Sequence, residues 1–590
     1  MLDIFFYFCT ILGFSLLPIG ESSIFRKIFQ SIALITIVLY LSSILGMLDL
    51  GIVAVQSISV ALLFFGVWRT HLNKEWYGFL SCGLSLAFIF SLAYFASLGK
   101  NFWAWDEFSH WGAQVDYLIA MKEIASDSSV MLFPDYIPGQ SLWRYYSYLK
   151  INSSDNSAIY FGNYVLIFTL IFCVTSSKGL VKLLQGVFVY LCLLFFFQSL
   201  IITLYVDHIQ ALLLLCFLHN LSSQERVNAS YLSLLVCMLV LSKHVGLIFA
   251  LFAVTSFALN EAFIKKSKMS NMLRNIAVIF IPAMSLFFFW ELYVEYYSLK
   301  REVVNVDKII LSGFLDTFNH LFASSKGLLN SFFPHANLIR SKYSSDSSVY
   351  LWQLISAVFT FVLCVSIFNK DLLKKRILYA VLSFSMIASY VLFLSYIRAG
   401  TPWAGDVYSF SRYVCVILFP IVVIPLLKIT KIRYLLPLTF GSILLSLPLS
   451  PPFSSVFSYV EKSPSVTHRD FDKKAQLVKK YVSSSDVIWY IQPQDSIVSY
   501  FVFREKVIPN PVLNFKDGWH LYVKSDLKSL TERLFLFKKN ICKVDYIYVD
   551  NKDDTFWDDY GIFFGNKRES LLFRINKVDG QCTVIPVVEG

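Results

Sequence analysis

Residues 77–112 decide the fold class, and they read YGFLSCGLSLAFIFSLAYFAS, then LGKNFWAW, then DEFSHWG. The first part, 77–97, is an apolar run of the length that a helix needs to cross a bilayer. Aromatic residues follow it, and these favour the boundary between membrane and water. Two adjacent carboxylates and an imidazole come next, at Asp106, Glu107 and His110. This order predicts proton or metal chemistry at a lipid surface; the alternative is that these side chains only solvate the start of a loop.

The composition places the whole chain in a membrane. Of its 590 residues 56% are hydrophobic and only 15% are charged, whereas soluble domains carry about 25% charged residues. We therefore expect an α-helical polytopic membrane protein with about 11 to 14 spans. The first segment has no basic leader and no small-residue cleavage site, so we expect it to remain as a span. The candidate spans are 3–19, 28–47, 50–67, 77–97, 157–176, 184–204, 208–220, 230–242, 245–260, 276–296, 350–368, 377–396, 412–427 and 433–449.

The basic residues indicate the orientation. The formal net charge of +11 comes from Lys and Arg clusters in short loops between spans, for example Arg26-Lys27 and Lys374-Lys375-Arg376. Such clusters mark cytoplasmic loops, so we interpret the charge as topology and expect no nucleic-acid partner. The loops 98–156 and 297–349, the turn 397–411 and everything after about residue 450 then lie outside the cytoplasm. This organisation predicts a membrane domain over 1–450 and an extracytoplasmic domain over 451–590.

The segments outside the membrane have patterns of their own. Apolar residues recur at helical spacing over 113–125, with Asp116 mostly on the other side, which predicts a helix in the interface plane. After residue 450 a soluble composition predicts a small α/β domain, with a helix over 473–481. Cys542 and Cys582 in this domain could pair in an oxidising compartment, a question that the sequence leaves open. The expected strands are 487–491, 497–503, 544–549, 571–575 and 583–588.

Besides the acidic pair, three groups of polar residues fall at outer helix ends under this topology. Asp207-His208 opens one span and either forms a helix cap or takes part in chemistry. Lys243-His244 stands between two short apolar segments and either extends toward the interface or binds a ligand. Arg398 and Arg412 stand at the two ends of the turn that precedes the span 412–427, and Arg412 is either a simple anchor or a binding group. Together, acids on one outer loop and cations on three others predict a cavity that holds a lipid phosphate and takes a proton from an incoming hydroxyl.

The order of these motifs resembles the GT-C class of polytopic glycosyltransferases, which includes aminoarabinose transferases and protein O-mannosyltransferases. Trp105-Asp106-Glu107 followed by a helix over 113–125 matches the acidic start of the first outer loop in that class. Tyr136-Ile137-Pro138-Gly139 is similar to its Tyr-Pro-Pro-Gly segment, with isoleucine in place of the first proline. The run 241–247 resembles its Leu-Thr-Lys-x-x-Gly-Leu pattern, and Ser411-Arg412-Tyr413 with Pro420 resembles its late Arg-Tyr…Pro helix. The resemblance covers about residues 70 to 430.

The resemblance implies an inverting transferase that takes a sugar from a polyprenyl-phosphate donor. It implies Asp106 as general base with Glu107 beside it, and it assigns the donor phosphate to Lys243, His244, Arg398 and Arg412. It leaves His110, Asp207 and His208 as candidates for acceptor or metal binding. Some members of the class use a divalent cation, so Mg or Mn is a possible cofactor here. The acceptor is a glycan, a lipid or a protein, and the expected location is a bacterial inner membrane.

Two other functions compete with this interpretation. An O-antigen ligase or polymerase also handles lipid-linked glycans outside the membrane, but it would not need an early acidic pair or a terminal α/β domain. A transporter or flippase would use broken helices such as those around Lys243, although it would often show two related halves, and this sequence has no visible repeat.

Overall fold

The computed structural model describes most of the chain outside its third quarter. The described residues are 2–17, 23–74, 76–104, 106–126, 131, 133–151, 156–175, 179–222, 228–299, 410–427, 466–491, 497–513, 530–550, 554–565, 567–578 and 581–587. The predicted spans 350–368, 377–396 and 433–449 lie outside these residues, as do Trp105, Arg398 and most of the loop 297–349.

The chain forms two compact units. Met1–Lys100 and Asp135–Val460 make up the first, which we call the helical unit. Asn101–Pro134 and Glu461–Gly590 make up the second, which we call the sheet unit. The first part of the predicted loop 98–156, including Asp106, therefore groups with the C-terminal residues, whereas the part after Pro134 groups with the spans.

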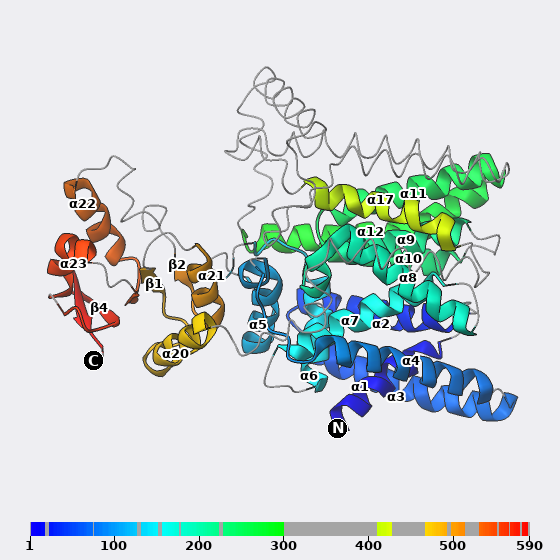
Figure 1. The fold of residues 1–590 in the computed structure, drawn as a ribbon, viewed down its shortest axis with the longest axis horizontal. Coiled ribbons are helices and arrows are strands. Elements are labelled where there is room, and N and C mark those ends of the chain that lie inside the picture. The colour runs from blue at the N-terminus through cyan, green and yellow to red at the C-terminus, as the bar shows by residue number, and fades with distance from the viewer. Residues whose placement is uncertain are drawn as a thin grey trace, which may run out of the picture. The chain divides into compact units, whose positions relative to one another are not determined.

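The helical unit consists of apolar helices that lie roughly parallel to one another (Figure 1). Helices span membranes because every backbone N–H and C=O is then satisfied within the segment. Six stretches in the described part are long and apolar enough to cross a bilayer: Ile24–Ile44, Leu48–Asn73, Trp76–Ser97, Gly179–Phe197, Gly246–Ile264 and Met269–Tyr296. The helices of the unit are α1 (Leu2–Ser15), α2 (Ile24–Ile44), α3 (Leu48–Asn73), α4 (Trp76–Ser97), α6 (Gly139–Ile151), α7 (Ser157–Cys173), α8 (Gly179–Phe197), α9 (Asp207–Ser222), α10 (Ala229–Ser242), α11 (Gly246–Leu259), α12 (Met269–Tyr296) and α17 (Phe410–Leu427), with short turns η2 (Gln198–Ile202) and η3 (Asn260–Ile264).

Helices that are distant in the chain pack together in this unit. α10 packs on α12, α9 on α17, α4 on α7, and α6 on both α7 and α2. α9 and α10 are buried along most of their length, so they form the interior of the bundle. The predicted spans 208–220, 230–242 and 245–260 correspond to the short helices α9, α10 and α11. Asp207 and His208 are the first residues of α9, and Lys243 lies between α10 and α11.

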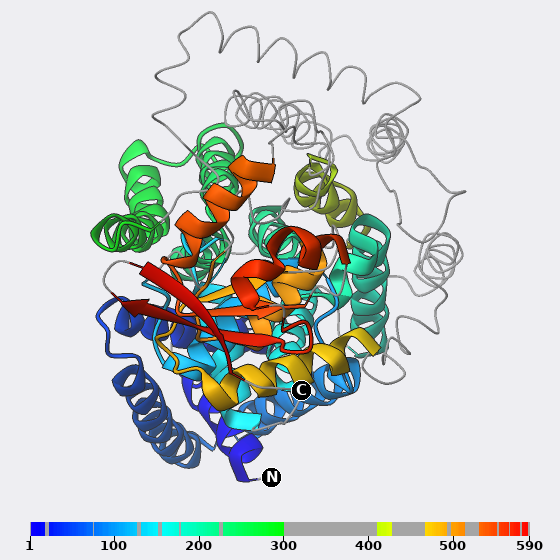
Figure 2. The ribbon, with the colours of Figure 1, turned by 90° about the vertical axis from the view of Figure 1, so that its left-hand side faces the viewer.

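Among the described residues the sheet unit has five strands in the order β2-β1-β3-β4-β5. Figure 2 shows the last of these strands in red. β1 pairs in parallel with both β2 and β3, whereas β4 is antiparallel to β3 and to β5. The predicted fold class, a polytopic helical membrane protein with a small C-terminal α/β domain, is confirmed; which side of the membrane this domain occupies stays a prediction. The elements are η1 (Glu107–Trp111), α5 (Gly112–Met121), α20 (Val466–Tyr481), β1 (Ile488–Ile491), α21 (Ile497–Lys506), β2 (Val512–Leu513), α22 (Leu530–Ile541), β3 (Tyr546–Val549), α23 (Asp554–Tyr560), η4 (Gly561–Phe564), β4 (Leu572–Val578) and β5 (Gln581–Pro586).

Helices cover both faces of the sheet. Because side chains alternate along each strand, neighbouring residues pack against helices on opposite faces. Trp489 and Ile547 face a core that includes Phe537 of α22 and Phe556 of α23. Their neighbours in sequence face the other way, where the Tyr490 ring stacks on Phe503 of α21 at 4.1 Å. Cover on both faces explains why the central strands β1 and β3 are continuous apolar runs with every residue buried.

The strand predicted over 497–503 is wrong, because Ile497–Lys506 form the helix α21. A short, fully apolar run has no periodicity that distinguishes a buried strand from a buried helix. The topology explains the outcome, since β1 and β2 are parallel neighbours and parallel strands need a crossover, which is usually helical. The other four predicted strands are present as β1, β3, β4 and β5, and β2 was not predicted.

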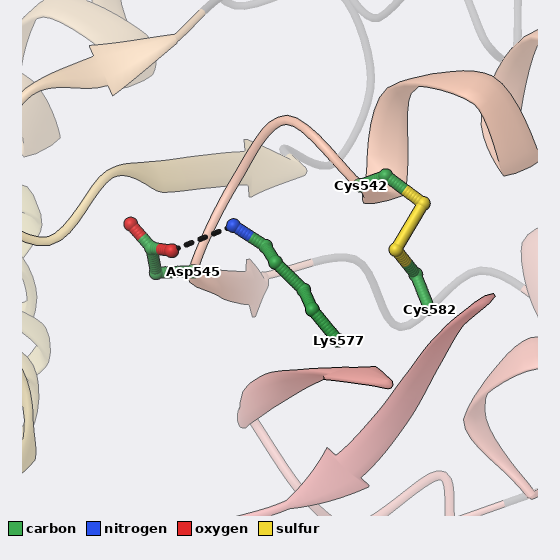
Figure 3. Close-up of a disulfide and its surroundings, with 4 residues drawn as sticks. All are labelled: Cys542, Asp545, Lys577 and Cys582. Atoms are coloured by element: carbon green, nitrogen blue, oxygen red, sulfur yellow. Dashed lines mark hydrogen bonds and ion pairs between the residues drawn. A yellow bond between two sulfur atoms is a disulfide. The ribbon is translucent and has the colours of Figure 1, made fainter. Parts of the chain in front are cut away.

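A disulfide and an ion pair connect the last strands to the rest of the sheet unit (Figure 3). Cys542, just after α22, is bonded to Cys582 of β5, which answers the question that the sequence left open. Beside it, Lys577 of β4 donates to Asp545 at 2.8 Å. Both links join the antiparallel edge of the sheet to the segment that leads into β3.

The loop helix α5 belongs to the core of the sheet unit. Ala113 and Tyr117 of α5 are buried in one cluster with Ile508, which follows α21. Asp116 is half-buried on α5, between the buried Val115 and Tyr117, and Glu505 of α21 is the acidic group that acts on it electrostatically. The segment Asn101–Pro134 and the C-terminal residues therefore fold as one unit.

Candidate functional site

Polar side chains gather at one end of the helical unit, where α10 ends and α11 begins. α10 ends at Ser242, Lys243 has extended backbone (φ −175°, ψ 156°), and α11 starts at Gly246. A Cβ at position 246 would collide with the carbonyl of Leu239, so this tight reversal requires glycine there. Lys243 is only 6% exposed, which places a cationic side chain inside an apolar bundle.

The segment before α6 packs directly on this break. A Cβ at Gly139 would lie 2.6 Å from the carbonyl oxygen of Leu241, so the two backbones meet closely. Lys243 Nζ lies 5.6 Å from the centre of the Tyr136 ring, within the range of a cation–π contact. Trp290 of α12 donates its indole N–H to the Asp135 carbonyl at 2.6 Å and fixes the segment from the other side. The two segments that carry the resemblance, 136–139 and 241–247, are thus neighbours in space.

His244 extends this site toward α12. Its ring lies 6.1 Å from that of Tyr136 and 6.1 Å from that of Phe287. Its Nε2 is 3.4 Å from the carboxylate of Glu291, and both side chains are 28% exposed. The imidazole of His244 therefore lies beside a carboxylate and two aromatic rings, and its ring nitrogens can hydrogen-bond a ligand.

α9 contributes buried polar groups at the same break. Gln210 donates its amide to the Ser242 hydroxyl at 2.8 Å, which joins the start of α9 to the end of α10. Asp207 and His208, one turn earlier, are 1% and 0% exposed. Asp207 is the first residue of α9, so it follows the N-cap position instead of occupying it, and burial of both side chains in an apolar bundle is costly.

Arg144 anchors α6 beside α9. Its guanidinium is fully buried and donates to Asn163 Oδ1 of α7 at 2.8 and 3.2 Å and to the Leu204 carbonyl at 2.8 Å. Arg144 and Asp207 are the charged groups that act electrostatically on the His208 ring. The basic and polar residues of α6, α9, α10 and the turn at 243–246 thus form one polar cluster in the helical unit.

The acidic pair lies in the sheet unit, and its two members differ in their surroundings. Glu107 is fully buried, and its Oε2 accepts the backbone N–H groups of Trp103 and Ala104, each at 2.9 Å. Asp106 stands at the start of the π-helical turn η1, is half-buried and makes no cap to the backbone. Glu107 therefore shapes the turn, whereas Asp106 has the more accessible carboxylate.

His110 is a core residue of the sheet unit. It is 4% exposed, its Nδ1 is 2.7 Å from the Ser109 hydroxyl, and its ring packs against Trp111 at 4.7 Å and Phe133 at 5.0 Å. These contacts suit a packing role better than the predicted role in acceptor or metal binding.

The two arginines predicted to bind phosphate cannot be placed. Arg398 lies outside the described residues, and Arg412 lies in α17 but its side chain is not described. No group of three or more His, Cys, Asp or Glu side chains arranged to hold a metal ion occurs in the part of the chain that the structure describes. The divalent cation stays a prediction.

Sequence reasoning missed Gln140, Arg144, Gln210 and Glu291. Glu291 and Gln210 sit within apolar spans, and polar residues in such spans are rare enough to mark functional sites. Arg144 lies in the predicted loop 98–156, where an arginine is expected to be exposed to solvent and gives no signal of a site. Only the fold shows that it is buried.

Two solved structures match this chain. ArnT from Cupriavidus metallidurans bound to undecaprenyl phosphate matches over 86% of this chain and 98% of that chain, with 11% identity and a TM-score of 0.36. Its apo state matches over 88% and 99%, with 10% identity and a TM-score of 0.37. At these TM-scores no residue role is transferred from ArnT. No protein-family model and no curated protein sequence matches the chain.

Proposed function

We propose that this protein is an inverting glycosyltransferase that moves a sugar from a polyprenyl-phosphate donor to a glycan, lipid or protein acceptor at the outer face of the membrane. The observation that carries the proposal is the buried amine of Lys243, held against the Tyr136 ring among apolar helices. A cation at a helix break in a membrane bundle suits an anionic headgroup whose apolar chain stays in the bilayer. His244 beside Glu291 adds a second basic group next to the same ring.

Asp106 is the general base in this proposal. The acceptor's oxygen bonds to the anomeric carbon while its proton passes to the Asp106 carboxylate, and the bond from that carbon to the phosphate oxygen breaks. Polyprenyl phosphate leaves with the bonding electrons, and a cationic side chain stabilises it; Lys243 of the helical unit is the proposed cation. One displacement inverts the anomeric centre. Glu107 is the weaker candidate because its Oε2 already binds two backbone N–H groups.

The disulfide supports the location. Disulfides persist in oxidising compartments and are rare in the cytosol, so Cys542–Cys582 favours an extracytoplasmic sheet unit. This agrees with the orientation that the basic loops predict, and the bacterial inner membrane remains our proposal for the host membrane. A divalent cation, if one is used, would need ligands such as Asp207 or His208 together with groups from elsewhere.

Two variants in the full chain test the proposal. Asp106→Asn should abolish glycan modification in cells while the purified protein still binds undecaprenyl phosphate, the lipid held by one of the matched structures. Lys243→Met should weaken binding of that lipid about ten-fold or more, because it removes a desolvated charge partner. Glu107→Gln is the control for the first variant, and Lys268→Met, an exposed lysine preceding α12, is the control for the second.

The outcomes separate the competing functions. Unchanged modification with Asp106→Asn would refute the base and favour the flippase, for which the broken helix at Lys243 is the supporting observation. Loss of modification without any change in sugar transfer from a supplied lipid-linked donor would place the defect in transport. Transfer of a whole polysaccharide instead of one sugar would indicate the ligase or polymerase.

A further inference from the structure

We infer that the buried side chains of Gln140, His208 and Gln210 form the hydrogen-bonding site for the sugar of the lipid-linked donor. This inference rests on the proposed function and adds to it the groups that recognise the sugar, as distinct from those that bind the phosphate. It is based on one observation: all three residues lie at the polar end of the helical unit, beside the break between α10 and α11 at Lys243.

Gln140 is the clearest member. It is the second residue of α6 and is 1% exposed. Among the described residues neither its Oε1 nor its Nε2 has a hydrogen-bond partner. A buried carboxamide with both ends unsatisfied loses its hydration and gains nothing in return, so it is disfavoured unless a ligand or ordered water completes it.

The backbone fixes where Gln140 lies. The preceding residue, Gly139, packs against the carbonyl of Leu241, two residues before Lys243. Gln140 is therefore held next to the end of α10 by a contact that tolerates no side chain at position 139. One helical turn later on the same face comes the buried Arg144.

Gln210 and His208 approach the same region from α9. Gln210 uses its Nε2 for Ser242, but its Oε1 is buried without a partner in the described part of the chain. His208 is fully buried beside the Phe197 ring at 6.4 Å, and neither ring nitrogen has a hydrogen-bond partner among the residues that are described. Its electrostatic neighbours are Asp207 of the same helix and Arg144 of α6.

The chemistry of this set matches a sugar and does not match a phosphate. A phosphate dianion only accepts hydrogen bonds, so it has no use for the acceptor oxygens of Gln140 and Gln210. Sugar hydroxyls both donate and accept, and a neutral imidazole and two carboxamides offer both donors and acceptors. A site built from buried hydrogen-bonding groups also discriminates strongly against a ligand that lacks the matching hydroxyl.

The test compares two lipids on the full-length protein in nanodiscs. One is undecaprenyl phosphate without a sugar; the other is a set of undecaprenyl phosphates carrying a hexose, an N-acetylhexosamine or an amino-pentose. Gln140→Leu keeps the shape and removes both unsatisfied atoms, so it should raise or preserve the melting temperature. It should leave binding of undecaprenyl phosphate unchanged and weaken binding of the preferred glycosylated lipid about ten-fold or more. Gln30→Leu is the matched control, because Gln30 is a buried glutamine near the start of α2 whose Nε2 also lacks a partner among the described residues.

The outcomes distinguish the inference from the proposed function. If wild-type protein binds undecaprenyl phosphate but Gln140→Leu does not alter binding of any glycosylated lipid, the sugar site is refuted and the proposed function stands. Equal weakening of both lipids, or a lowered melting temperature, would assign Gln140 to structure and also refute the sugar site. If wild-type protein binds neither lipid, the proposed function fails and the inference fails with it.

Discussion

Lys243 holds its Nζ 5.6 Å from the centre of the Tyr136 ring, so the reversal after α10 and the segment before α6 meet through a cation and an aromatic face. The same ring contacts His244 at 6.1 Å. One tyrosine thus orders two basic side chains at the helix break. Because the ring attracts the amine by its quadrupole, it also keeps a charged group stable where water is scarce.

Two substitutions of Tyr136 should distinguish the contribution of its aromatic ring to lipid binding from the contribution of its hydroxyl. Tyr136→Phe keeps the aromatic face, so we expect binding of undecaprenyl phosphate close to that of the wild type. Tyr136→Leu removes the face and should weaken binding about two- to five-fold, the equivalent of about 0.5–1 kcal/mol for a cation–π contact. The measurement is lipid affinity of purified protein at fixed salt. Equal affinities for the Phe and Leu variants would show that the ring does not order the amine.

Glu107 and Asp106 should respond differently to mutation, because Glu107 is fully buried and its Oε2 accepts two backbone N–H groups, whereas Asp106 is half-buried. Glu107→Ala leaves the N–H groups of Trp103 and Ala104 without their buried acceptor, which should cost about 2 kcal/mol or more of stability. Glu107→Gln supplies a neutral acceptor at the same place and should cost less. Thermal unfolding and limited proteolysis of the full chain measure both changes. Asp106→Asn should leave stability unchanged, and a large loss there would mean that Asp106 is also structural.

The spans were predictable from the sequence because length and hydropathy determine them. The helix predicted over 113–125 is α5, Gly112–Met121, and four of the five predicted strands are present. The failure at 497–503 has a clear cause, since Tyr500–Glu505 are all buried and therefore have no exposed face. This segment is a helix because it connects the parallel strands β1 and β2. The pairing of these strands depends on the whole sheet and cannot be read from the segment itself.

The site was predictable only in part. Lys243 and His244 stand out in sequence because they interrupt an apolar run, and the structure places them beside the 136–139 segment that the same reasoning selected. The difference between Asp106 and Glu107 depends on two backbone hydrogen bonds that adjacency cannot reveal. The sequence did not single out Gln140, because the property that makes it a candidate is a buried carboxamide without hydrogen-bond partners among the described residues. Only the structure shows this property.

The carboxyl pair of Asp116 and Glu505 should make the sheet unit sensitive to pH. Burial raises the pKa of Asp116 well above its ordinary value; the charge of Glu505 and a hydrogen bond to it raise that pKa further, while Lys506 and Lys479 oppose the shift. The native state therefore holds this proton more tightly than the unfolded chain does. Its stabilising contribution is complete below the unfolded pKa of about 4 and is lost as the pH rises through the higher folded pKa.

We accordingly expect the protection factors of the α21 amides, which correct for the rise of intrinsic exchange with pH, to be higher at pH 5 than at pH 8. Asp116→Asn should flatten this pH dependence and stabilise the unit at pH 8, since an amide donates to Glu505 without having to ionise. Asp558→Asn, at an exposed position paired with Arg568, is the control and should leave the slope as it is. A wild-type slope in Asp116→Asn would show that other groups determine the pH dependence.

Breaking the disulfide should destabilise the sheet unit and report its compartment. Cys542 and Cys582 are 40 residues apart, and closing a loop of that size stabilises a fold by about 4 kcal/mol in the chain-entropy model. Cys542→Ser should therefore lower stability by roughly 2–4 kcal/mol, measured by urea unfolding with and without reductant. The matched control is Cys82→Ser, which changes a buried free cysteine of α4 and should abolish none of the reductant sensitivity. In cells, an alkylating probe applied without reductant should leave Cys542 and Cys582 unlabelled. Labelling of both in intact cells would place the sheet unit in a reducing compartment and reverse the orientation that the basic loops predict.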